Sequence, residues 1–487
     1  MIPVVDVLSR LQYHGLMAQP VPRTDLAVSG VSDDSRQVRP GDLYCAIRGY
    51  VHDGHRFLED AAEAGAAAAL VEIPEASLDL PQFQVADSRR AAAIAAQVVL
   101  GDPSAGLRLI GVTGTNGKTT TVHVIRHVLS RFGACGSLGT LGSITASGSR
   151  IASDLTTPGP VEFARRLADL RDGGVECVVA EVSSHALAQA RVDGVAFDVG
   201  VFTNLSRDHL DYHAGFDEYR NTKLRLVDLV RSGGTLVVNA DEPAWSGIGE
   251  GKRVVRFGLE GMAEYRARKV ELRATGSNWI LSGPQGETAV ELPLLGEFNV
   301  ANALAAAAVA GESGMDLRAI AEALASTPPV LGRLEVLSQE PLVLRDYAHT
   351  PDALRRALLA LRPLVRGRLI CLFGCGGDRD RGKRPQMGRA AAEGADLVIV
   401  TSDNPRTEPP EAIIAEILPG LEGVEFEPEV NRRSAIARAL DLAEPGDAVL
   451  LAGKGHEDYQ IVGTERRPFD EAVVVRELLA GSGGESR

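Results

Sequence analysis

A glycine-rich segment, GVTGTNGKTTT at residues 111–121, continues the apolar run at 107–112 and leads into a helical pattern. Its ending, Gly117-Lys118-Thr119, matches the phosphate-binding pattern GxxxxGK[ST], although Val112 stands where that pattern has its first glycine. Loops of this kind present backbone N–H groups to phosphates at a helix start, and their lysine and hydroxyl add a charge and a Mg²⁺ ligand. The sequence therefore predicts a strand, a phosphate-binding turn and a helix.

Apolar strands alternate with helical segments on both sides of this loop, which is typical of a parallel, doubly wound sheet. Residues 252–295 differ, because their short alternating strands predict a small antiparallel addition. From about Leu331 onward, four buried strands each lead into a polar or glycine-rich loop, as at the ligand-binding edge of an open α/β sheet. We therefore expect an α/β chain of three domains. These are a small N-terminal α/β domain (1–103), a central phosphate-loop domain with a mostly parallel sheet (104–331) and a C-terminal Rossmann-like domain (332–487).

The charge balance narrows the possible partners. The chain has 65 acidic and 51 basic residues and a net charge of −14, which argues against nonspecific binding to nucleic acid or anionic lipid. There is no apolar run near the roughly 20 residues of a membrane span, and the N-terminus lacks the pattern of a signal peptide. The five cysteines include no CxxC pair, so we expect free thiols. These features predict a cytoplasmic protein that acts on small molecules, without nucleic acid or membrane partners. We expect it to be a monomer, although none of these features bears on the oligomeric state.

The nucleotide chemistry is narrowed by two further observations. There is no guanine-reading NKxD motif, and the apolar strand CVVAE ends in Glu181, a carboxylate able to hold Mg²⁺ near a triphosphate. At this level two classes remain open. One is an ATP-dependent enzyme, and the other is a nucleotide-dependent switch that hydrolyses ATP without further chemistry.

A series of motifs then runs in order along nearly the whole chain. The motifs are TGTNGKTTT, LTTPGP (155–160), EVSSHAL (181–187), FTNLSRDHLDYH (202–213), EFNVANALAA (297–306), GRLE (332–335), DYAHTPDAL (346–354) and GCGGDRDRGKRP (374–385), together with Lys223. With these motifs the sequence resembles the Mur ligases, the ATP-dependent enzymes that build the peptidoglycan precursor peptide. TSDNPRTE (401–408) and AGKGHEDYQ (452–460) resemble the branch that adds meso-diaminopimelate as the third residue. The lysine-adding branch and a folylpolyglutamate synthase-like ligase are the alternatives.

This resemblance implies an acid–amino-acid ligase of cytoplasmic peptidoglycan synthesis. ATP would phosphorylate the D-glutamate carboxylate of UDP-N-acetylmuramoyl-L-alanyl-D-glutamate, and an amine of diaminopimelate would attack the acyl phosphate. Mg²⁺ is the implied cofactor and ATP the co-substrate. Such an enzyme must hold three anionic partners and neutralise the transferring phosphoryl group.

The resemblance also assigns residues around the nucleotide. Composition alone makes Lys223 an exposed helix residue, whereas the resemblance makes it a carbamylated lysine beside the metal. It implies Lys118, Lys223, His209 and Arg333 as catalytic residues, and Thr119, Glu181, His209 and Lys223 as metal ligands. Nucleotide contacts would come from Gly114, Thr115, Asn116, Gly117, Lys118, Thr119, Thr120, Asn299, Arg333 and Asp346, with His349 and Lys383 at the border. His213 has no assigned role, and His123 and His127 are expected to be packing or surface residues.

The remaining implied residues bind the two other substrates. For the UDP-muramoyl peptide they are Asp33, Ser35, the Tyr50-Val51-His52 turn, Thr156, Thr157, Ser183, Gln189 and Arg191. For diaminopimelate they are Arg379, Asp403, Asn404, Pro405, Arg406, Gly453 and Glu457. Arg406 can hold a carboxylate by two parallel hydrogen bonds, and Asp403 and Glu457 can accept from an ammonium group. Lysine has no distal carboxylate and would leave Arg406 unpaired, so we expect a strong preference for diaminopimelate.

Overall fold

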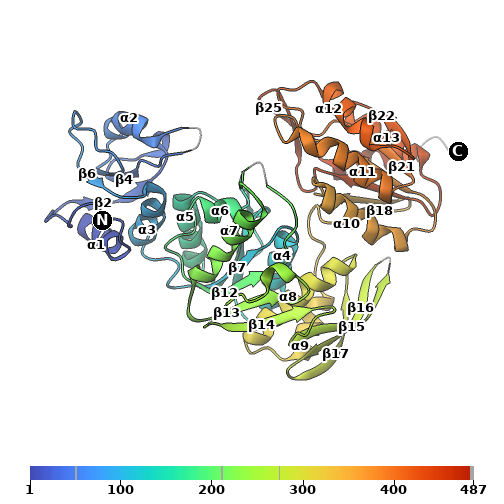
Figure 1. The fold of residues 1–487 in the computed structure, drawn as a ribbon, viewed down its shortest axis with the longest axis horizontal. Coiled ribbons are helices and arrows are strands. Elements are labelled where there is room, and N and C mark those ends of the chain that lie inside the picture. The colour runs from blue at the N-terminus through green and yellow to red at the C-terminus, as the bar shows by residue number, and fades with distance from the viewer. Residues whose placement is uncertain (50–51, 210–211, 250, 274, 483–487) are drawn as a thin grey trace.

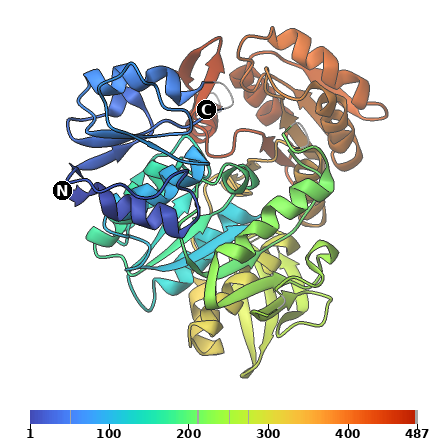
Figure 2. The same ribbon diagram turned by 60° about the vertical axis from the view of Figure 1, so that its left-hand side comes forward.

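The computed structural model describes residues 1–49, 52–209, 212–249, 251–273 and 275–482. Within these residues the strands form a four-stranded, an eleven-stranded and a six-stranded sheet, with two further two-stranded pairs. The three larger sheets follow one another along the chain, and the central sheet lies between the two outer units (Figure 1). Both outer units lie on the same side of the central one (Figure 2). This arrangement agrees with the predicted three-unit α/β fold.

The N-terminal unit is a parallel sheet in the order β3-β4-β5-β6. Its alanine-rich helix α3 begins after Asp87, whose carboxylate accepts from the N–H groups of Arg89 and Arg90, as expected of an N-cap. Alanine side chains let this helix pack closely on the sheet. The elements are β1 (Ile2–Pro3), α1 (Val4–Tyr13), β2 (Ala27–Val28), β3 (Gly30–Ser32), β4 (Asp42–Cys45), α2 (Leu58–Glu63), β5 (Ala68–Val71), β6 (Gln82–Gln84) and α3 (Ser88–Val99).

The central sheet has the order β10-β9-β8-β11-β7-β12-β13-β14-β15-β16-β17. Its strands from β8 to β15 pair in parallel, and both edges are antiparallel. Within residues 252–295, which were expected to form a small antiparallel addition, β14 pairs in parallel with both of its neighbours, and β15, β16 and β17 pair antiparallel and extend the main sheet. The strands are β7 (Arg108–Thr113), β8 (Cys135–Gly139), β9 (Gly142–Ile144), β10 (Arg150–Ile151), β11 (Cys177–Glu181), β12 (Phe197–Phe202), β13 (Val230–Asn239), β14 (Arg253–Gly258), β15 (Tyr265–Arg273), β16 (Gly276–Gly283) and β17 (Gly286–Leu292).

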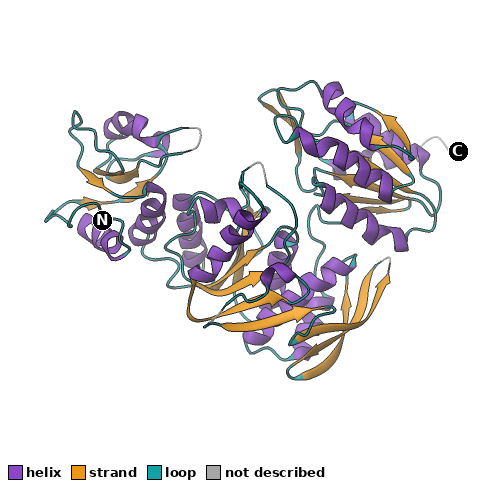
Figure 3. Cartoon of the chain, in the orientation of Figure 1, coloured by secondary structure: helices purple, strands orange, loops and turns teal. Residues whose placement is uncertain are grey.

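Helices cover both faces of this sheet (Figure 3). On one face α4 and α8 share a buried cluster with the apolar side chains of the strands, and on the other face Phe163 and Leu226 belong to a second cluster. Helix α8 is buried along most of its length, which explains its apolar, alanine-rich sequence. The helices are α4 (Lys118–Leu129), α5 (Pro160–Asp172), α6 (Ser184–Ala188), α7 (Phe216–Leu229), α8 (Glu297–Glu312) and α9 (Leu317–Ala325).

The C-terminal sheet has the order β18-β19-β23-β20-β21-β22 and is parallel except at β18. Two buried clusters lie on its two faces. The elements are β18 (Glu335–Gln339), β19 (Leu342–Asp346), α10 (Pro351–Leu361), β20 (Leu369–Phe373), α11 (Arg384–Gly394), β21 (Leu397–Val400), α12 (Pro410–Ile417), β22 (Glu425–Pro428), α13 (Arg432–Leu442), β23 (Ala448–Ala452), β24 (Tyr459–Val462), β25 (Glu465–Pro468) and α14 (Glu471–Ser482). We propose domain boundaries between residues 103 and 104 and between residues 331 and 332.

Among the described residues, none of the helices combines the length and apolarity needed to cross a membrane.

Candidate active site

The phosphate loop lies at the carboxyl end of β7, which pairs in parallel with β11 and β12. Gly117 has a φ of 82° immediately before α4, where left-handed backbone favours glycine. A Cβ on Gly114 would lie 1.9 Å from Thr203 Oγ1, so only glycine permits this close approach to the end of β12. Thr115, Asn116, Thr119 and Thr120 complete the turn and the first helical residues. The sequence therefore folds here as the strand, turn and helix that it predicts.

Two lysines converge on this loop from different helices. Lys118 Nζ donates to the carbonyl oxygens of Gly114 (3.0 Å) and Thr115 (2.8 Å), and Lys223 Nζ from α7 donates to Gly114 (2.8 Å). Lys223 is 1% exposed and lies over the ring of Tyr219. Burial lowers the pKa of both lysines, and Lys118 lowers that of Lys223 further. The loop thus concentrates two amines whose hydrogen-bond acceptors are neutral carbonyls.

Glu181, at the end of β11, lies beside the first turn of α4. Its carboxylate accepts from Thr119 Oγ1 (3.1 Å) and from the Thr140 N–H (2.8 Å). Burial raises the pKa of Glu181, although Lys118 and Thr140 act in the opposite direction. Arg333 from the C-terminal unit donates to Thr119 Oγ1 at 3.1 Å. Residues 118, 119, 181 and 333 therefore meet at one point.

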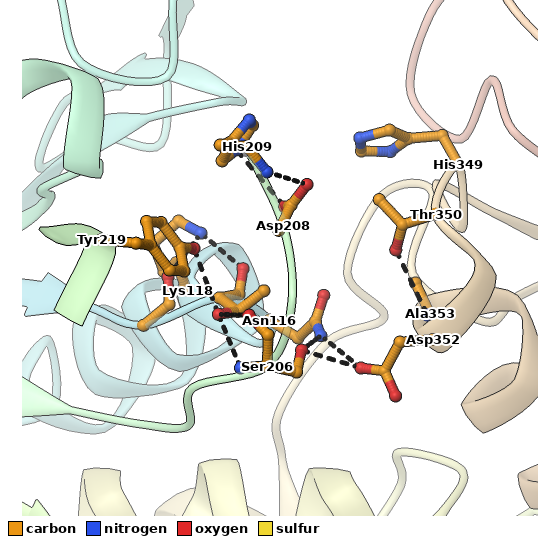
Figure 4. A network of polar contacts seen from close by, with 12 residues as sticks. Asn116, Lys118, Ser206, Asp208, His209, Tyr219, His349, Thr350, Asp352 and Ala353 are labelled. Carbon is orange, nitrogen blue, oxygen red and sulfur yellow. Dashed lines mark hydrogen bonds and ion pairs between the residues drawn. The ribbon is translucent and has the colours of Figure 1, made fainter. Parts of the chain in front are cut away.

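His209 follows Asp208 on the loop after β12, and its backbone has a φ of 52°. The Asp208 carboxylate lies 3.3 Å from His209 Nε2 (Figure 4). Burial lowers the pKa of His209 to about 4, and His185 and both lysines add to this effect. Burial raises the pKa of Asp208, but the nearby His209, His349 and Lys118 outweigh this effect. The pKa of Asp208 is therefore lowered. At neutral pH this segment therefore offers an uncharged imidazole and a carboxylate.

Asn299 in α8 lies behind the loop and is buried. Its Nδ2 donates to Leu295 O (2.8 Å), and its Oδ1 accepts from Asn302 Nδ2 (2.9 Å). Asn302 Oδ1 in turn accepts from Thr121 Oγ1 and would lie 2.5 Å from a Cβ on Gly117. The two amides thus connect α8 to the phosphate loop.

The C-terminal unit reaches the phosphate loop through the start of α10 as well as through Arg333. One oxygen of Asp352 accepts from Asn116 Nδ2 (3.1 Å) and from Ser206 Oγ (2.9 Å) (Figure 4). Lys383 Nζ donates to the carbonyl of His349 at 3.1 Å. The two bonds of Asp352 join segments more than 100 residues apart, so the site is shared between two units.

Asp346 lies in the C-terminal unit, at the end of β19. It accepts from the Leu334 N–H at 2.7 Å, directly after Arg333. Burial raises the pKa of Asp346, and Arg333 opposes this shift. The Arg333 guanidinium lies 4.6 Å from the centre of the Tyr347 ring. Asp346 thus fixes the backbone that presents Arg333.

The residues expected to bind the muramoyl peptide form one hydrogen-bonded group. Thr157 Oγ1 donates to Glu181 O (2.8 Å) and to Ser183 Oγ (3.3 Å). Arg191 donates to Thr157 O (2.7 Å) and to Gln189 Oε1 (2.7 and 3.1 Å). Burial lowers the pKa of Arg191. The group adjoins the carboxylate of Glu181 through Thr156, which accepts from Thr140 Oγ1 at 3.1 Å.

Asp33 and Ser35 lie in the N-terminal unit, between β3 and β4. Burial raises the pKa of Asp33, and Arg165 of α5 opposes this shift. A Cβ on Gly159 would lie 3.7 Å from Asp33 Oδ2, so Asp33 adjoins the LTTPGP segment. Of the expected turn at 50–52, only His52 falls within the described residues.

The residues expected to bind diaminopimelate gather at the carboxyl ends of β20, β21 and β23. A Cβ on Gly376 would lie 3.0 Å from Arg406 Nη1 and 3.7 Å from Arg379 Cγ, so the two arginines flank this glycine. Burial lowers the pKa of Arg406, and Arg379 adds to the shift. Pro405 O accepts from the Glu408 N–H at 3.1 Å and so belongs to the same turn. Two neighbouring guanidinium groups are well placed to bind a carboxylate.

Lys454 already occupies the acidic part of this region. It is 0% exposed and donates to Asn404 Oδ1 and Glu457 Oε2, both at 3.2 Å. Asp403 Oδ1 lies 3.5 Å from the same ammonium group, and a Cβ on Gly453 would lie 2.9 Å from Asp403 Oδ2. The carboxylates expected to meet a substrate amine are therefore already paired with this lysine.

Comparisons with known proteins place this geometry in a family. Residues 27–105, 112–310 and 332–455 match the models described as Mur ligase family catalytic domain, Mur ligase middle domain and Mur ligase glutamate ligase domain. A relative from Gloeobacter violaceus, named UDP-N-acetylmuramoyl-L-alanyl-D-glutamate--2,6-diaminopimelate ligase, is 44% identical and covers 98% of this chain and 99% of its own. The chain belongs to the Mur ligase family.

Two further similarities cover almost the same length of this Mur ligase. A relative from Thermosynechococcus vestitus with the same name is 43% identical over 94% of each chain. A solved structure bearing that name has 34% identity and a TM-score of 0.67, and the match covers 97% of this chain and 99% of the other. The likeness therefore extends over all three units.

Several residues that contact the candidate site of this Mur ligase were not predicted from the sequence. Asn302, Ser206, Asp352 and Lys454 all lie within motifs quoted for the resemblance, so the motifs contained their signal. Residue type alone did not separate them from their neighbours, since their roles depend on partners far away in the chain. Thr140 lies outside those motifs and had no signal.

The histidines of α4 behave as expected of packing residues. Burial lowers the pKa of His123 to about 4, and His127 Nε2 lies 3.1 Å from both Ala323 O and Ser326 Oγ. His213 is buried, with its ring 5.2 Å from that of Tyr219. Among the described residues, no group of three or more His, Cys, Asp or Glu side chains is arranged so that it could hold a metal ion.

Proposed function

We propose that this chain uses ATP to join meso-diaminopimelate to the D-glutamate carboxylate of UDP-N-acetylmuramoyl-L-alanyl-D-glutamate. The curated relatives cited above carry the name of this reaction at 43–44% identity over 94% or more of the chain. One contact between two units supports this proposal. Arg333 of the C-terminal unit donates to Thr119 of the phosphate loop, so two units supply cations to the same phosphates.

The residues of the loop suit phosphoryl transfer to an acid. Lys118 and Arg333 would neutralise the γ-phosphoryl group while a substrate carboxylate oxygen attacks phosphorus and ADP leaves. The muramoyl-binding group, from Thr157 to Arg191, adjoins Glu181 and would hold the acid in line. The amine nitrogen of diaminopimelate then attacks the acyl carbon, and the C–O bond to phosphate breaks. The amide forms, and the nitrogen loses its proton.

We infer Mg²⁺ as the cofactor from the donor chemistry. Mg²⁺ prefers oxygen ligands and is usually held by one or two carboxylates, waters and the phosphates themselves. Glu181 and the Thr119 hydroxyl supply such oxygens, and a neutral His209 can add a nitrogen ligand. The few protein donors fit an ion held largely by substrate. When bound, the ion would offset negative charge on the phosphates.

We propose that Lys223 is carbamylated in the active chain. Its amine is buried and its pKa is well below the usual value, so a neutral nitrogen can attack CO₂, forming an N–C bond and releasing a proton. The product is an anion beside Lys118 and the loop. The Lys223→Ala variant should lose activity and recover part of it with a short carboxylic acid. Full activity of that variant in ordinary buffer would exclude the modification.

The amino-acid substrate follows from the two guanidinium groups. Arg379 and Arg406 would bind the distal carboxylate of diaminopimelate, which lysine lacks. Asn404 and Glu457 are positioned by Lys454 and would receive the distal ammonium. The lysine-adding and folylpolyglutamate-type alternatives give no reason for this pair of arginines.

Phosphate release distinguishes these functions. The purified chain with ATP and Mg²⁺ should release phosphate only when the UDP-dipeptide and diaminopimelate are both present, and much more slowly with lysine or folate. Oxygen-18 in the D-glutamate carboxylate should appear in the released phosphate. ATP hydrolysis independent of any amine would favour a nucleotide switch, and unlabelled phosphate would exclude an acyl phosphate.

We propose that the chain acts as a monomer in the cytoplasm. Its partners are small molecules, namely ATP, the UDP-dipeptide and diaminopimelate. Light scattering of the purified chain and fractionation of cells that express it test both statements.

A further inference from the structure

Two cysteines at the amino ends of neighbouring strands of the central sheet form a pair that the ligase reaction does not use. Cys135 begins β8 and Cys177 begins β11, and they are direct partners in the parallel register of these strands. Partners in a parallel register point to the same face of a sheet, and both residues belong to the cluster under α4. Neighbouring strands lie about 4.8 Å apart, which falls within the Cα separation that a disulfide spans.

The surroundings of the pair favour a thiolate. The Cys135 thiol donates to Gly136 O at 3.7 Å. Its interaction with Cys177 lowers the pKa of Cys177, and Arg108 adds to that shift, while burial and Asp198 oppose it. The same interaction and burial raise the pKa of Cys135. Arg126 of α4 lies near Cys135, and within the described part of the chain its buried Nε has no hydrogen-bond partner. Arg126 lowers the pKa of Cys135 and so opposes the effect of burial there.

Solvent also reaches Cys177 more readily than it reaches the other thiols. Cys177 is partly exposed, whereas the other four cysteines are buried. Arg108, its register partner on β7, lines an open cavity of about 510 Å³. In contrast, burial raises the pKa of Cys371 and of Cys375 to about 12. Low pKa, exposure and a neighbouring thiol together define a redox-active cysteine.

We propose that Cys177 and Cys135 form a redox-sensitive dithiol that hydrogen peroxide converts to a disulfide between β11 and β8. The Cys177 thiolate attacks one peroxide oxygen, so that an S–O bond forms, the O–O bond breaks and hydroxide leaves. Cys135 then attacks the sulfenic sulfur, forming the S–S bond and expelling the oxygen as water. Two thiols are oxidised, and one peroxide is reduced to two waters.

The crosslink would lie four residues from the active site along β11. Glu181 ends the strand that Cys177 begins, and Thr140, which donates to Glu181, directly follows β8. The disulfide would therefore join the two strands that hold the proposed metal carboxylate. We expect ligase activity to change on oxidation and to return with dithiothreitol.

Mass spectrometry of the full chain tests the pairing. After one equivalent of hydrogen peroxide and alkylation of the remaining thiols, peptides containing residues 135 and 177 should be joined. Cys177 should react at least about tenfold faster than Cys371, since each unit of pKa changes the thiolate fraction tenfold. Equal alkylation of Cys135, Cys177 and Cys371 after oxidation would overturn the proposal.

Three variants separate the two roles. Cys135→Ser should stop at a sulfenic acid on Cys177 that dimedone traps, and Cys177→Ser should leave Cys135 reduced. Cys375→Ser is the matched control and should form the crosslink as the parent chain does. A Cys135→Ser chain that gives no dimedone adduct would contradict the proposed order of attack. Oxidation is read by mass, so it is independent of whether the chain ligates diaminopimelate.

Discussion

The phosphate edge and the amino-acid edge of this site hold their buried cations in different ways. At the phosphate edge, formed by residues 114–119, 181 and 223, the two lysines donate to backbone carbonyls. At the amino-acid edge, formed by residues 403–406 and 453–457, Lys454 is surrounded by Asp403, Asn404 and Glu457. Lys118 therefore donates to neutral acceptors and can pair with an anionic ligand, whereas Lys454 is already paired with carboxylates.

This difference separates residues that serve binding from residues that serve folding. A buried cation without an anion partner is unfavourable in the empty protein and gains its partner only when an anionic ligand binds. A buried cation within an ion-paired group supports the fold, and its removal leaves charges unpaired. Mutations at the two edges should consequently affect different measurements.

The largest expected effect is on catalysis at the phosphate edge. Replacing Lys118 by methionine should reduce phosphate release by at least about 10³-fold, because the transferring phosphoryl group loses a fixed cation. Thermal unfolding should change little. Lys252→Met, on the segment between β13 and β14, is the control and should remain active. If Lys118→Met kept more than a tenth of the parent rate, the phosphate edge would not differ from the amino-acid edge in its effect on catalysis.

At the amino-acid edge the main effect should be on stability. Lys454→Met leaves Asp403 and Glu457 without their ammonium partner, so we expect a loss of about 3–5 kcal/mol in the free energy of unfolding. Denaturant titration measures it, and adding Glu457→Gln to the variant should restore part of the loss. If Lys454→Met and Lys118→Met unfolded at the same denaturant concentration, the two edges would not differ as described.

The sequence predicted the parts of the fold and site that depend on local pattern. Strand, turn and helix at 107–129 follow from apolar periodicity and glycine, and the loops after buried strands predicted where ligands bind. The antiparallel strands after β14 were expected, but their continuity with the main sheet was not, because pairing between strands is not a local property.

Contacts between distant residues could not be predicted. Nothing in the local pattern around Lys454 indicates that it is fully buried, since lysine is normally exposed. The bond from Asp352 to Asn116 joins residues 236 positions apart. Motif resemblance pointed to the right segments, and only the folded chain shows which side chain in each segment meets another.

Substrate selectivity tests whether the second edge also has charge available for a ligand. Arg406→Lys should reduce the preference for diaminopimelate over lysine by about 10- to 100-fold, because a single ammonium group does not replace a planar guanidinium on a carboxylate. Competition between the two amino acids in one reaction measures the ratio directly. Arg381→Lys changes an exposed ion pair with Glu416 and should leave the preference intact. An unchanged preference in Arg406→Lys would place carboxylate recognition elsewhere.

Asp352 joins the C-terminal unit to the phosphate loop, and its removal should have a smaller effect. Asp352→Ala loses the bonds to Asn116 and Ser206, so we expect about a tenfold rise in KM for ATP or diaminopimelate with less change in kcat. The rise reflects looser docking of the C-terminal unit, with about 1.4 kcal/mol corresponding to tenfold. Arg356→Ala removes the bond that Arg356 donates to Asp352 within α10 but keeps the bonds to Asn116 and Ser206, so it should behave as the parent. Unchanged distances between labels on the two units would argue against a docking role.

The smallest effect concerns the stability of the empty chain at the phosphate edge. The pKa of Lys223 is well below its usual value in the fold, so between that value and about 10.4 the unfolded chain holds one more proton than the folded chain. The free energy of unfolding should therefore rise with pH over this interval. Lys223→Met should flatten that rise and, in CO₂-free buffer at neutral pH, stabilise the chain by about 1 kcal/mol. Denaturant titrations of parent, Lys223→Met and Lys252→Met at several pH values measure it. A Lys223→Met chain that is less stable than its parent at neutral pH and keeps the full slope would show that this amine supports the fold, as Lys454 does.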